Sequence, residues 1–381
     1  MVKGPLDPDW RDHLDDARRN LRQWWKRLRR GLRNSAPAVA VRRNDRRVAI
    51  RAAAAELRLL KQAEQPSTVS GVTVVACMRD EEARLPDFLH HYRRLGAAGF
   101  ILIDNYSRDG SRDVAMAAPD VQLLAAEGAY SERLFGMDWV MAAIGQAGLG
   151  RWYLVADIDE LFVYDDCERR RLPELVRLLE RCGQKSMPVM MLDMYGPLSV
   201  VRTRFMSGAS MLDTCPFHDV DYEIDVDAAR QWDARRRVIH YRGGPRARMF
   251  STPDRPFQGI LAKTPLIFWD RRTLYLDPHM AYPFNYNLEP LRGALLHFKF
   301  FSDFHDRAVA AIEHGQHWKG SSEYRHYLRV IESNPHLTLF DSRSRRYRSS
   351  ASLVEVGLMP PLPWADAPVV PAGERHPVPS A

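Results

Sequence analysis

Two carboxylates one residue apart, Asp157 and Asp159, follow an apolar run that begins at Trp152. The run predicts a strand, and alternate side chains of a strand share a face. We therefore expect both carboxylates to point the same way, with Glu160 on the opposite face. Oxygen ligands at this spacing suit Mg²⁺ or Mn²⁺ and leave coordination positions for the phosphate oxygens of a nucleotide diphosphate. An isolated Asp-x-Asp is more often only the acidic end of a strand, so the neighbouring elements must decide between the two interpretations.

A β-α-β pattern precedes this acidic motif. Buried strands are predicted over residues 72–77 and 100–104, and the apolar residues between them recur at helical spacing. A third strand around residues 121–124 and a helix over 132–147 lead to the acidic motif. Parallel strands bring their carboxyl ends to one sheet edge, where open α/β sheets bind ligands. Asp104 ends the second strand, so we expect it to lie beside the acidic motif.

Three motifs in this part of the chain resemble those of the family-two glycosyltransferases. The segment Asp104–Ser111 is similar to their Asp-Asp-Gly-Ser-Thr-Asp-Gly-Thr signature, with Asn105 and Tyr106 in place of the usual second Asp and the Gly. Arg79–Glu82 resembles the Asn-Glu-Glu that follows their first strand. Asp157–Glu160 falls where these enzymes carry a metal-binding Asp-x-Asp. The three motifs occur in the family's order, each at the end of a predicted strand.

The resemblance covers roughly residues 70–200 and implies a GT-A fold, a Rossmann-like and mostly parallel α/β sheet flanked by helices. It implies a nucleotide-sugar donor, with a UDP-sugar favoured, and a Mn²⁺ or Mg²⁺ ion that joins Asp159 to the diphosphate. By the same resemblance Asp104 would accept a hydrogen bond from the base, and Asp80 or Glu81 would lie near the ribose or base. The predicted donor-side residues are Asp80, Glu81, Asp104, Asp109, Asp157, Arg246, Lys263 and Lys299, and the predicted metal ligands are Asp157, Asp159 and His297.

Basic side chains later in the chain are candidates to complete such a site. Lys263 lies among apolar neighbours, where an unpaired ammonium is costly. Residues 241–248 carry three arginines, including Arg246, and two glycines, a composition that suits either a phosphate cradle or a solvated loop. His297 interrupts an apolar run predicted as a strand, so it is either a hydrogen-bonded core residue or a metal ligand. Lys299 shares its face of that strand and could reach the diphosphate.

An inverting transfer needs a general base within hydrogen-bond reach of the acceptor hydroxyl. Asp193 in a predicted buried strand is one candidate. Asp221 and Glu223 in a predicted acidic loop are the others, and the sequence does not decide among them. For each of the three, a structural carboxylate in a turn is the alternative. His279 follows Asp277 and Pro278 in a predicted loop, where we expect it at the surface.

Positive charge is concentrated near the N-terminus. Residues 1–66 carry nine more basic than acidic side chains, and the whole chain of 381 residues carries +7, so the remainder carries −2. We predict three regions: a basic helical arm (1–66), a GT-A domain (67–345) and a Pro-rich tail (346–381). Within the arm, Leu21–Arg33 has an apolar stripe with cations beside it. This pattern suits a helix on a membrane surface, a helix packed on the catalytic domain, or a coiled coil with residues 52–60. Nucleic-acid binding is not expected, because its aromatics share the leucine stripe.

The composition excludes several other classes of protein. No apolar run approaches the length of a transmembrane helix, and residues 1–7 lack the apolar core of a secretory signal, so we expect a cytoplasmic protein, peripheral to the inner face of the plasma membrane where the arm contacts it. Four cysteines without Cys-x-x-Cys spacing predict neither a zinc site nor a disulfide framework. The function expected is a metal-dependent, inverting glycosyltransferase of polysaccharide biosynthesis with a cell-surface glycan or lipid-linked acceptor. A nucleotide-sugar hydrolase or pyrophosphorylase, or an inactive GT-A scaffold, are the alternatives.

Overall fold

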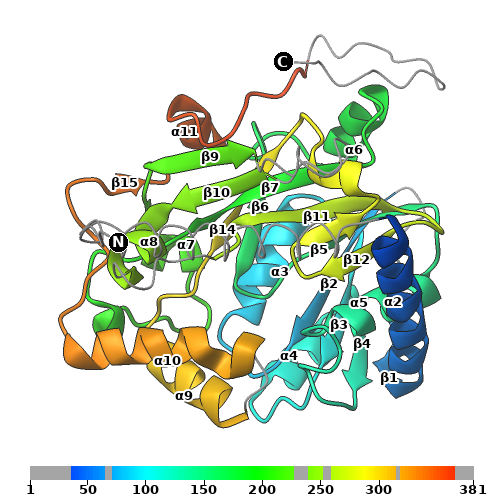
Figure 1. Cartoon of the computed structure of the whole chain (residues 1–381), viewed down its shortest axis with the longest axis horizontal. Helices are drawn as coiled ribbons and strands as arrows, with labels where there is room; N and C mark the ends of the chain where they lie inside the picture. Colours follow the sequence, from blue (N-terminus) through cyan, green and yellow to red (C-terminus); the bar gives the residue numbers. More distant parts are fainter. Residues whose placement is uncertain (1–35, 65–70, 227–238, 252–258, 315–317, 365–381) are drawn as a thin grey trace, which may run out of the picture.

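The computed structural model describes residues 36–64, 71–226, 239–251, 259–314 and 318–364. At its centre lies a nine-stranded sheet with the strand order β1-β4-β3-β2-β5-β11-β7-β14-β6 (Figure 1). Six strands run in one direction, whereas β1, β11 and β6 run the opposite way. The sheet strands are β1 (Leu57–Lys61), β2 (Val72–Met78), β3 (Gly99–Asp104), β4 (Val121–Ala126), β5 (Arg151–Val155), β6 (Glu160–Val163), β7 (Ser186–Asp193), β11 (Ala262–Trp269) and β14 (Gly293–His297). The predicted α/β class with a mostly parallel sheet is confirmed.

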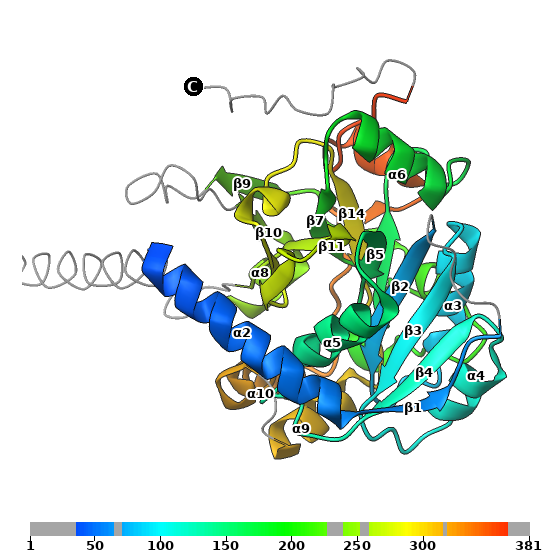
Figure 2. The same ribbon diagram turned by 90° about the vertical axis from the view of Figure 1, so that its right-hand side faces the viewer.

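Helices cover both faces of this sheet. The helices α3 (Leu85–Arg94), α4 (Ser111–Ala117) and α6 (Leu172–Arg181) pack on one face, and α2 (Ala36–Glu56) and α5 (Met137–Ala147) pack on the other (Figure 2). The apolar positions of α3 repeat at helical spacing, so one stripe of the helix faces the sheet. Phe88 in that stripe is fully buried, and burial of such a side chain stabilises the fold by about 1.5–3 kcal/mol.

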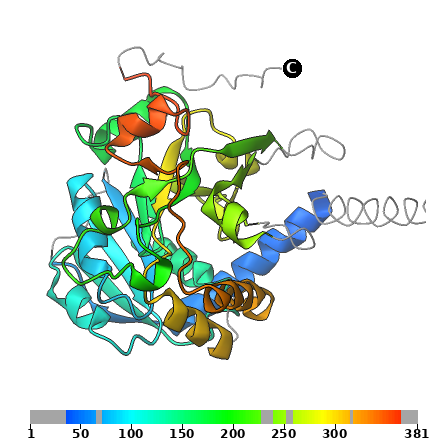
Figure 3. The same ribbon diagram turned by 90° about the vertical axis from the view of Figure 1, so that its left-hand side faces the viewer.

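Smaller elements surround the sheet. A third apolar cluster joins α8 (Gly244–Phe250), α9 (Phe304–His314) and α10 (Trp318–Ser333). Figure 3 shows α11 (Ser350–Glu355, red) at the end of the molecule opposite α9 and α10 (orange). The remaining elements are β8 (Phe217–His218), β9 (Tyr222–Val226), β10 (Ile239–Gly243), β12 (Leu274–Asp277), β13 (Met280–Tyr282), β15 (Arg345–Arg346), α7 (Met211–Thr214), η1 (Val200–Arg202) and η3 (Phe284–Asn287).

The acidic motif departs from the predicted geometry. The apolar run is not one strand: β5 ends at Val155, and the chain turns before β6 begins at Glu160. β5 lies between β2 and β11, whereas β6 is an edge strand beside β14. The strand alternation expected for Asp157, Asp159 and Glu160 is therefore wrong, because these residues span a turn between two strands of the sheet. A second correction concerns the helix predicted over 132–147, which begins only at Met137, after three residues with left-handed backbone.

Part of the predicted N-terminal arm belongs to the body of the fold. β1 pairs with β4 at one edge of the central sheet, and α2 packs against α5. Since Leu57–Lys61 is a strand, a coiled coil extending over residues 52–60 is wrong. The stripe over Leu21–Arg33 lies outside the described residues. No helix in the described part of the chain combines the length and the apolar character that crossing a membrane requires.

The segment after residue 345 also packs on the domain, as far as residue 364. Leu353 on α11 is fully buried, and Met359 and Leu362 are nearly so. The side chains of Glu168 and Asp165 accept backbone hydrogen bonds from this segment. The part of the predicted tail up to residue 364 is thus part of the folded domain, and the rest lies outside the described residues.

Candidate functional site

Four polar residues lie where strands end at one edge of the sheet. Asp104 is the last residue of β3, Asp193 of β7 and His297 of β14, while Asp159 lies in the turn after β5. In the register of β7 and β14, His297 lies opposite Asp193. These strands run in the same direction, so their carboxyl ends share an edge, as expected for the ligand-binding edge of an α/β sheet.

Asp159, His297, Asp193 and Arg246 form a continuous line of contacts. The Nε2 atom of His297 lies 3.6 Å from Asp159 Oδ2, and its Nδ1 atom lies 2.8 Å from Asp193 Oδ1. Arg246 Nε donates a hydrogen bond of 2.6 Å to Asp193 Oδ2. Burial alone would raise the pKa of Asp193, but Arg246 and His297 outweigh burial and lower it to about 2. Asp193 thus stays ionised and holds the imidazole in one orientation.

Asp159 and His297 have the chemistry of a partial site for a divalent ion. A carboxylate oxygen and an imidazole nitrogen are both suitable ligands for Mn²⁺. The second ring nitrogen of His297 meets a carboxylate, which is the usual arrangement for a histidine that binds a metal. Within the described residues, however, no group of three or more His, Cys, Asp or Glu side chains is arranged to hold a metal ion. The two residues would hold an ion only together with oxygens from a ligand or from water.

Asp157 and Glu160 contact the same cation, Lys263 on β11. Lys263 Nζ lies 2.7 Å from Glu160 Oε2 and 3.1 Å from Asp157 Oδ2. Glu160 Oε2 also accepts a hydrogen bond of 2.8 Å from the backbone N–H of Asp157. Glu160 is therefore not turned away from Asp157 as predicted, and Lys263 pairs with protein carboxylates. Lys263 is predicted from the sequence as a donor-side residue, whereas here its ammonium bonds to two carboxylates of the protein.

In the triad of Asp157, Glu160 and Lys263, burial acts in opposite directions on the pKa of the lysine and on that of the glutamate. For Lys263, burial lowers the pKa, but Asp157 and Glu160 outweigh it and raise the pKa above its ordinary value. For Glu160, burial is the largest effect, and it raises the pKa to about 7 although Lys263 acts to lower it. Two carboxylates thus share one ammonium, with Asp157 the more exposed of the two.

Several cations lie around Asp159. Burial acts to raise the pKa of its carboxyl, but His297, Arg307, Arg84 and Lys299 together hold the pKa below its ordinary value. Lys299 Nζ also lies 4.7 Å from the centre of the Tyr324 ring. The sequence reasoning missed Arg84 and Arg307. Arg84 follows Arg79–Glu82 closely enough to have been noticed, whereas Arg307 reaches this place only through the packing of α9.

The two predicted donor motifs fold against each other. The backbone N–H of Arg108 donates a hydrogen bond of 2.6 Å to Asp80 Oδ1, and the backbone N–H of Glu82 donates one of 2.9 Å to Asp109 Oδ2. Glu81 is buried, and its carboxylate accepts hydrogen bonds of 2.6 and 3.0 Å from Arg307. The segments that carry Asp80, Glu81 and Asp109 are therefore hydrogen-bonded to each other, and carboxylate oxygens of all three residues are already bonded within the protein.

Asp104 is fully buried at the end of β3. Its Oδ2 atom accepts a hydrogen bond of 2.6 Å from Arg112 Nε, and its Oδ1 atom accepts one of 3.3 Å from the backbone N–H of Ser107. Two residues later, Tyr106 adopts a left-handed backbone with φ 61° and exposes its side chain. A glycine would adopt this conformation at lower cost.

The three candidates for the general base differ in their burial and in their contacts. Asp193 is buried between Arg246 and His297, and its low pKa makes it a weak base, so its contacts argue for a positioning role. Asp221 and Glu223 are exposed, at the start of β9, and the contacts described for this structure join neither of them to Asp159. Residues 241–248, expected to form either a phosphate cradle or a solvated loop, are the end of β10 followed by α8, and this helix delivers Arg246 to Asp193.

We expect His297→Ala to raise the Mn²⁺ concentration needed for activity, because the change removes the ring nitrogen that lies 3.6 Å from the Asp159 carboxylate. A histidine that only packs in the core would behave differently: its loss would cost about 1–3 kcal/mol of stability and leave the metal requirement unchanged. Titration of activity with Mn²⁺, together with the melting temperature, separates the two cases. His218→Ala is the matched control, since His218 is also buried and bonded, to the backbone oxygen of Asp219. An activation curve that His297→Ala leaves unaltered would show that His297 is a core residue.

Comparison with known proteins gives only distant likenesses. No family model matches the chain, and no curated protein matches it. Among solved structures, glucosyl-3-phosphoglycerate synthase from Mycobacterium tuberculosis, in complex with Mn²⁺, UDP and phosphoglyceric acid, matches with a TM-score of 0.21 and 16% identity over 32% of this chain and 43% of its own. A 4-diphosphocytidyl-2C-methyl-D-erythritol synthase matches with a TM-score of 0.23 and 16% identity over 33% of this chain and 62% of its own. A putative glucose-1-phosphate thymidylyltransferase from Bacillus anthracis matches with a TM-score of 0.22 and 9% identity over 35% of this chain and 61% of its own. The chain thus spans less than two thirds of each protein, and likenesses of this extent assign no activity to it.

Proposed function

We propose that the chain is a metal-dependent, inverting glycosyltransferase that uses a nucleotide-sugar donor, with a UDP-sugar favoured. The observation that carries the proposal is the line of contacts from Asp159 through His297 and Asp193 to Arg246 at the carboxyl edge of the sheet. It lies at the edge that also carries Asp104. The acceptor proposed is a cell-surface glycan or a lipid-linked precursor.

Each part of the site has a task in this reaction. Asp159 and His297 would hold a Mn²⁺ or Mg²⁺ ion, which supplies positive charge to the departing nucleoside diphosphate. Arg307 and Lys299 lie close enough to affect the Asp159 carboxylate, so they add positive charge to the same place. Asp193 fixes the orientation of His297, and Arg246 keeps Asp193 ionised. Asp104 supports the turn over which the base would lie.

Two other functions use the same donor site. A nucleotide-sugar hydrolase would transfer the sugar to water and needs no acceptor cavity. A pyrophosphorylase is disfavoured, because residues 76–81, at the end of β2 and directly after it, contain no glycine that would let the backbone approach a triphosphate closely. An inactive scaffold would not bind nucleotides in a metal-dependent way.

The decisive experiment is calorimetry of the whole chain with UDP, GDP, CDP and dTDP, each with and without Mn²⁺. We expect one nucleotide to bind measurably tighter when Mn²⁺ is present. Binding of none of the four under either condition would contradict the proposal. If a nucleotide binds but Mn²⁺ does not strengthen its binding, the metal is no longer part of the proposal.

Contact with the inner face of the plasma membrane through Leu21–Arg33 is a further part of the proposal. Cations beside an apolar stripe favour binding to anionic lipids. Because α2 and β1 belong to the fold, the comparison should remove residues 1–35 only. Vesicles with and without an anionic lipid would test whether this truncation lowers membrane binding.

A further inference from the structure

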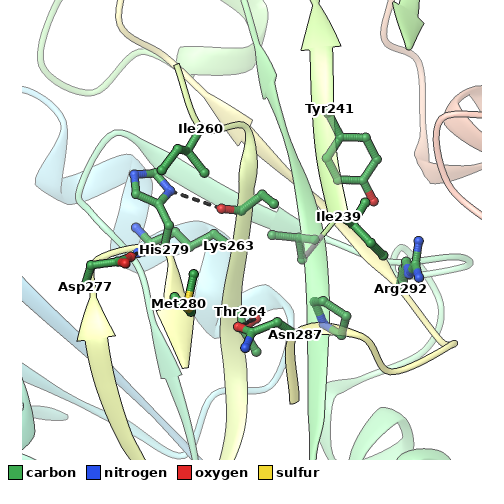
Figure 4. Close-up of a pocket in the computed structure, with 13 residues that line it drawn as sticks. Ile239, Tyr241, Ile260, Lys263, Thr264, Asp277, His279, Met280, Asn287 and Arg292 are labelled. Atoms are coloured by element: carbon green, nitrogen blue, oxygen red, sulfur yellow. Dashed lines mark hydrogen bonds between the residues drawn. The ribbon is translucent and has the colours of Figure 1, made fainter. Parts of the chain in front are cut away.

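A cavity lies beside Lys263, at the beginning of β11. It is a small cavity of about 50 Å³ that opens to solvent, and its lining comes from β7, β10, β11 and the β12–β13 hairpin (Figure 4). Much of the lining is apolar and includes Val189, Ile239, Tyr241 and Ile260. Polar groups of Lys263, Asp277 and His279 gather on one side, and the Tyr241 ring lies on the other.

The contacts of His279 in this cavity determine which ring nitrogen carries the hydrogen. It is half-buried, in contrast to the surface position expected from the sequence, and its Nδ1 atom lies 3.1 Å from the backbone oxygen of Ala262. A carbonyl oxygen only accepts hydrogen bonds, so the neutral ring must carry its hydrogen on Nδ1. The Nε2 atom then presents a lone pair, and no described residue is shown bonding to it. The backbone N–H of His279 donates to Asp277 Oδ1 at 2.9 Å, which fixes the turn that carries the ring.

The charges around His279 favour its neutral form. Burial is the largest effect and lowers the pKa of the imidazole, and Lys263 lowers it further. Asp277, the Ala262 carbonyl and Asp157 act in the opposite direction without reversing the shift. The other charged residue in the lining is Arg292, which is a cation. The ring is therefore neutral at neutral pH, with its Nε2 lone pair free of a proton.

The cavity adjoins the acidic turn through Lys263. This side chain lines the cavity, and its Nζ atom lies 3.1 Å from Asp157 Oδ2. A ligand in the cavity would thus approach the carboxyl edge of β5, where the donor sugar is expected. None of the three carboxylates considered as the general base lines the cavity.

We propose that this cavity binds the hydroxyl-bearing edge of a sugar acceptor and that His279 Nε2 is the general base of the transfer. The inference rests on the proposed function. The acceptor oxygen forms a bond to the anomeric carbon while the bond from that carbon to the diphosphate oxygen breaks. The electron pair of the broken bond leaves with the nucleoside diphosphate, and the hydroxyl proton moves to Nε2. The Tyr241 ring offers an apolar surface to one face of the sugar.

The test uses the whole chain, the UDP-sugar donor and a panel of monosaccharides and methyl glycosides, with UDP release as the measurement. We expect His279→Gln to lower kcat by about 10²–10⁴-fold and to leave the Kd for Mn²⁺ and UDP unchanged. The fall in rate of the parent at acid pH should disappear in this variant. Added imidazole should restore turnover to His279→Ala, which has room for it. His336→Gln, at an exposed histidine, is the control and should match the parent.

The possible outcomes separate this inference from the function on which it rests. Failure of the parent to bind UDP overturns the proposed function and the inference with it. Normal UDP binding combined with full turnover by His279→Gln overturns the assignment of His279 as the general base and leaves the proposed function standing. Lower turnover without imidazole rescue, accompanied by a lower melting temperature, means that His279 has a structural role and also overturns it. A parent that binds the donor but releases no UDP with any member of the panel overturns the assignment of the cavity to sugar acceptors.

Discussion

Asp159→Ala is expected to abolish Mn²⁺-dependent binding of the nucleoside diphosphate and to lower turnover at least about a hundredfold. Loss of a metal ligand removes several kcal/mol of charge stabilisation in the transition state. In the parent, neighbouring cations keep the Asp159 carboxyl ionised, so the charge is present over the whole neutral range. Calorimetry with UDP and Mn²⁺, followed by a UDP-release assay, measures both effects.

The control for this variant is Asp113→Ala, at an exposed carboxylate in the first turn of α4. It should bind UDP as the parent does. Equal melting temperatures for the parent and Asp159→Ala would show that the loss is not a loss of folding. If Asp159→Ala binds UDP with the same dependence on Mn²⁺ as the parent, Asp159 does not bind the metal.

Lys263→Met should lower the free energy of unfolding by about 3–5 kcal/mol at pH 8, because it leaves the buried carboxylate of Glu160 without its cation. The loss should be smaller at pH 5. Glu160 in the parent has a pKa of about 7, above its ordinary value, so the folded state binds more protons than the unfolded state between about pH 4.5 and 7. Stability from this group therefore falls as the pH rises through that window, and removal of Lys263 extends the fall to higher pH. Urea unfolding at both pH values provides the measurement.

A second change on the same background identifies the cause. Lys263→Met combined with Glu160→Gln removes the buried charge, so it should recover part of the stability at pH 8 and lose most of the pH dependence. Lys185→Met is the matched control, since Lys185 is about half exposed and lies 3.8 Å from Asp270. It should change stability by about 1 kcal/mol or less. A loss in Lys263→Met that is equal at pH 5 and pH 8 would contradict this explanation.

Local sequence patterns predicted the first half of the sheet well. The strands β2, β3 and β4 and the helix α3 have strong apolar periodicity and form where expected. The patterns failed at Asp157–Glu160, because a continuous apolar run does not reveal that the chain leaves one strand and enters another elsewhere in the sheet. In the basic N-terminal region they predicted a helix but missed the strand at Leu57–Lys61, which pairs with β4.

The contacts of the site were beyond the reach of local patterns. Asp193 and His297 meet because β14 pairs with β7, and the two residues are 104 positions apart in the chain. Arg246 reaches Asp193 from a helix, and Arg307 reaches Glu81 from another. His279 was expected at the surface because the sequence around it resembles a loop, whereas the β12–β13 hairpin folds its ring against β11. Residue types indicated which side chains need partners, and the topology determined which partners they have.

The edge strand β1 has a consequence for the solubility of shortened forms of the protein. It covers the outer side of β4, an apolar strand over residues 121–126, and Lys61 at its end donates to the Met116 carbonyl at 2.8 Å. A cut at residue 66, where the charge pattern changes, would remove this cover and leave unpaired the N–H and C=O groups of β4 that face away from β3. Such an edge pairs readily with the same edge of another molecule. Aggregation of a chain shortened in this way would reflect the lost strand and say nothing about the role of the basic residues before it.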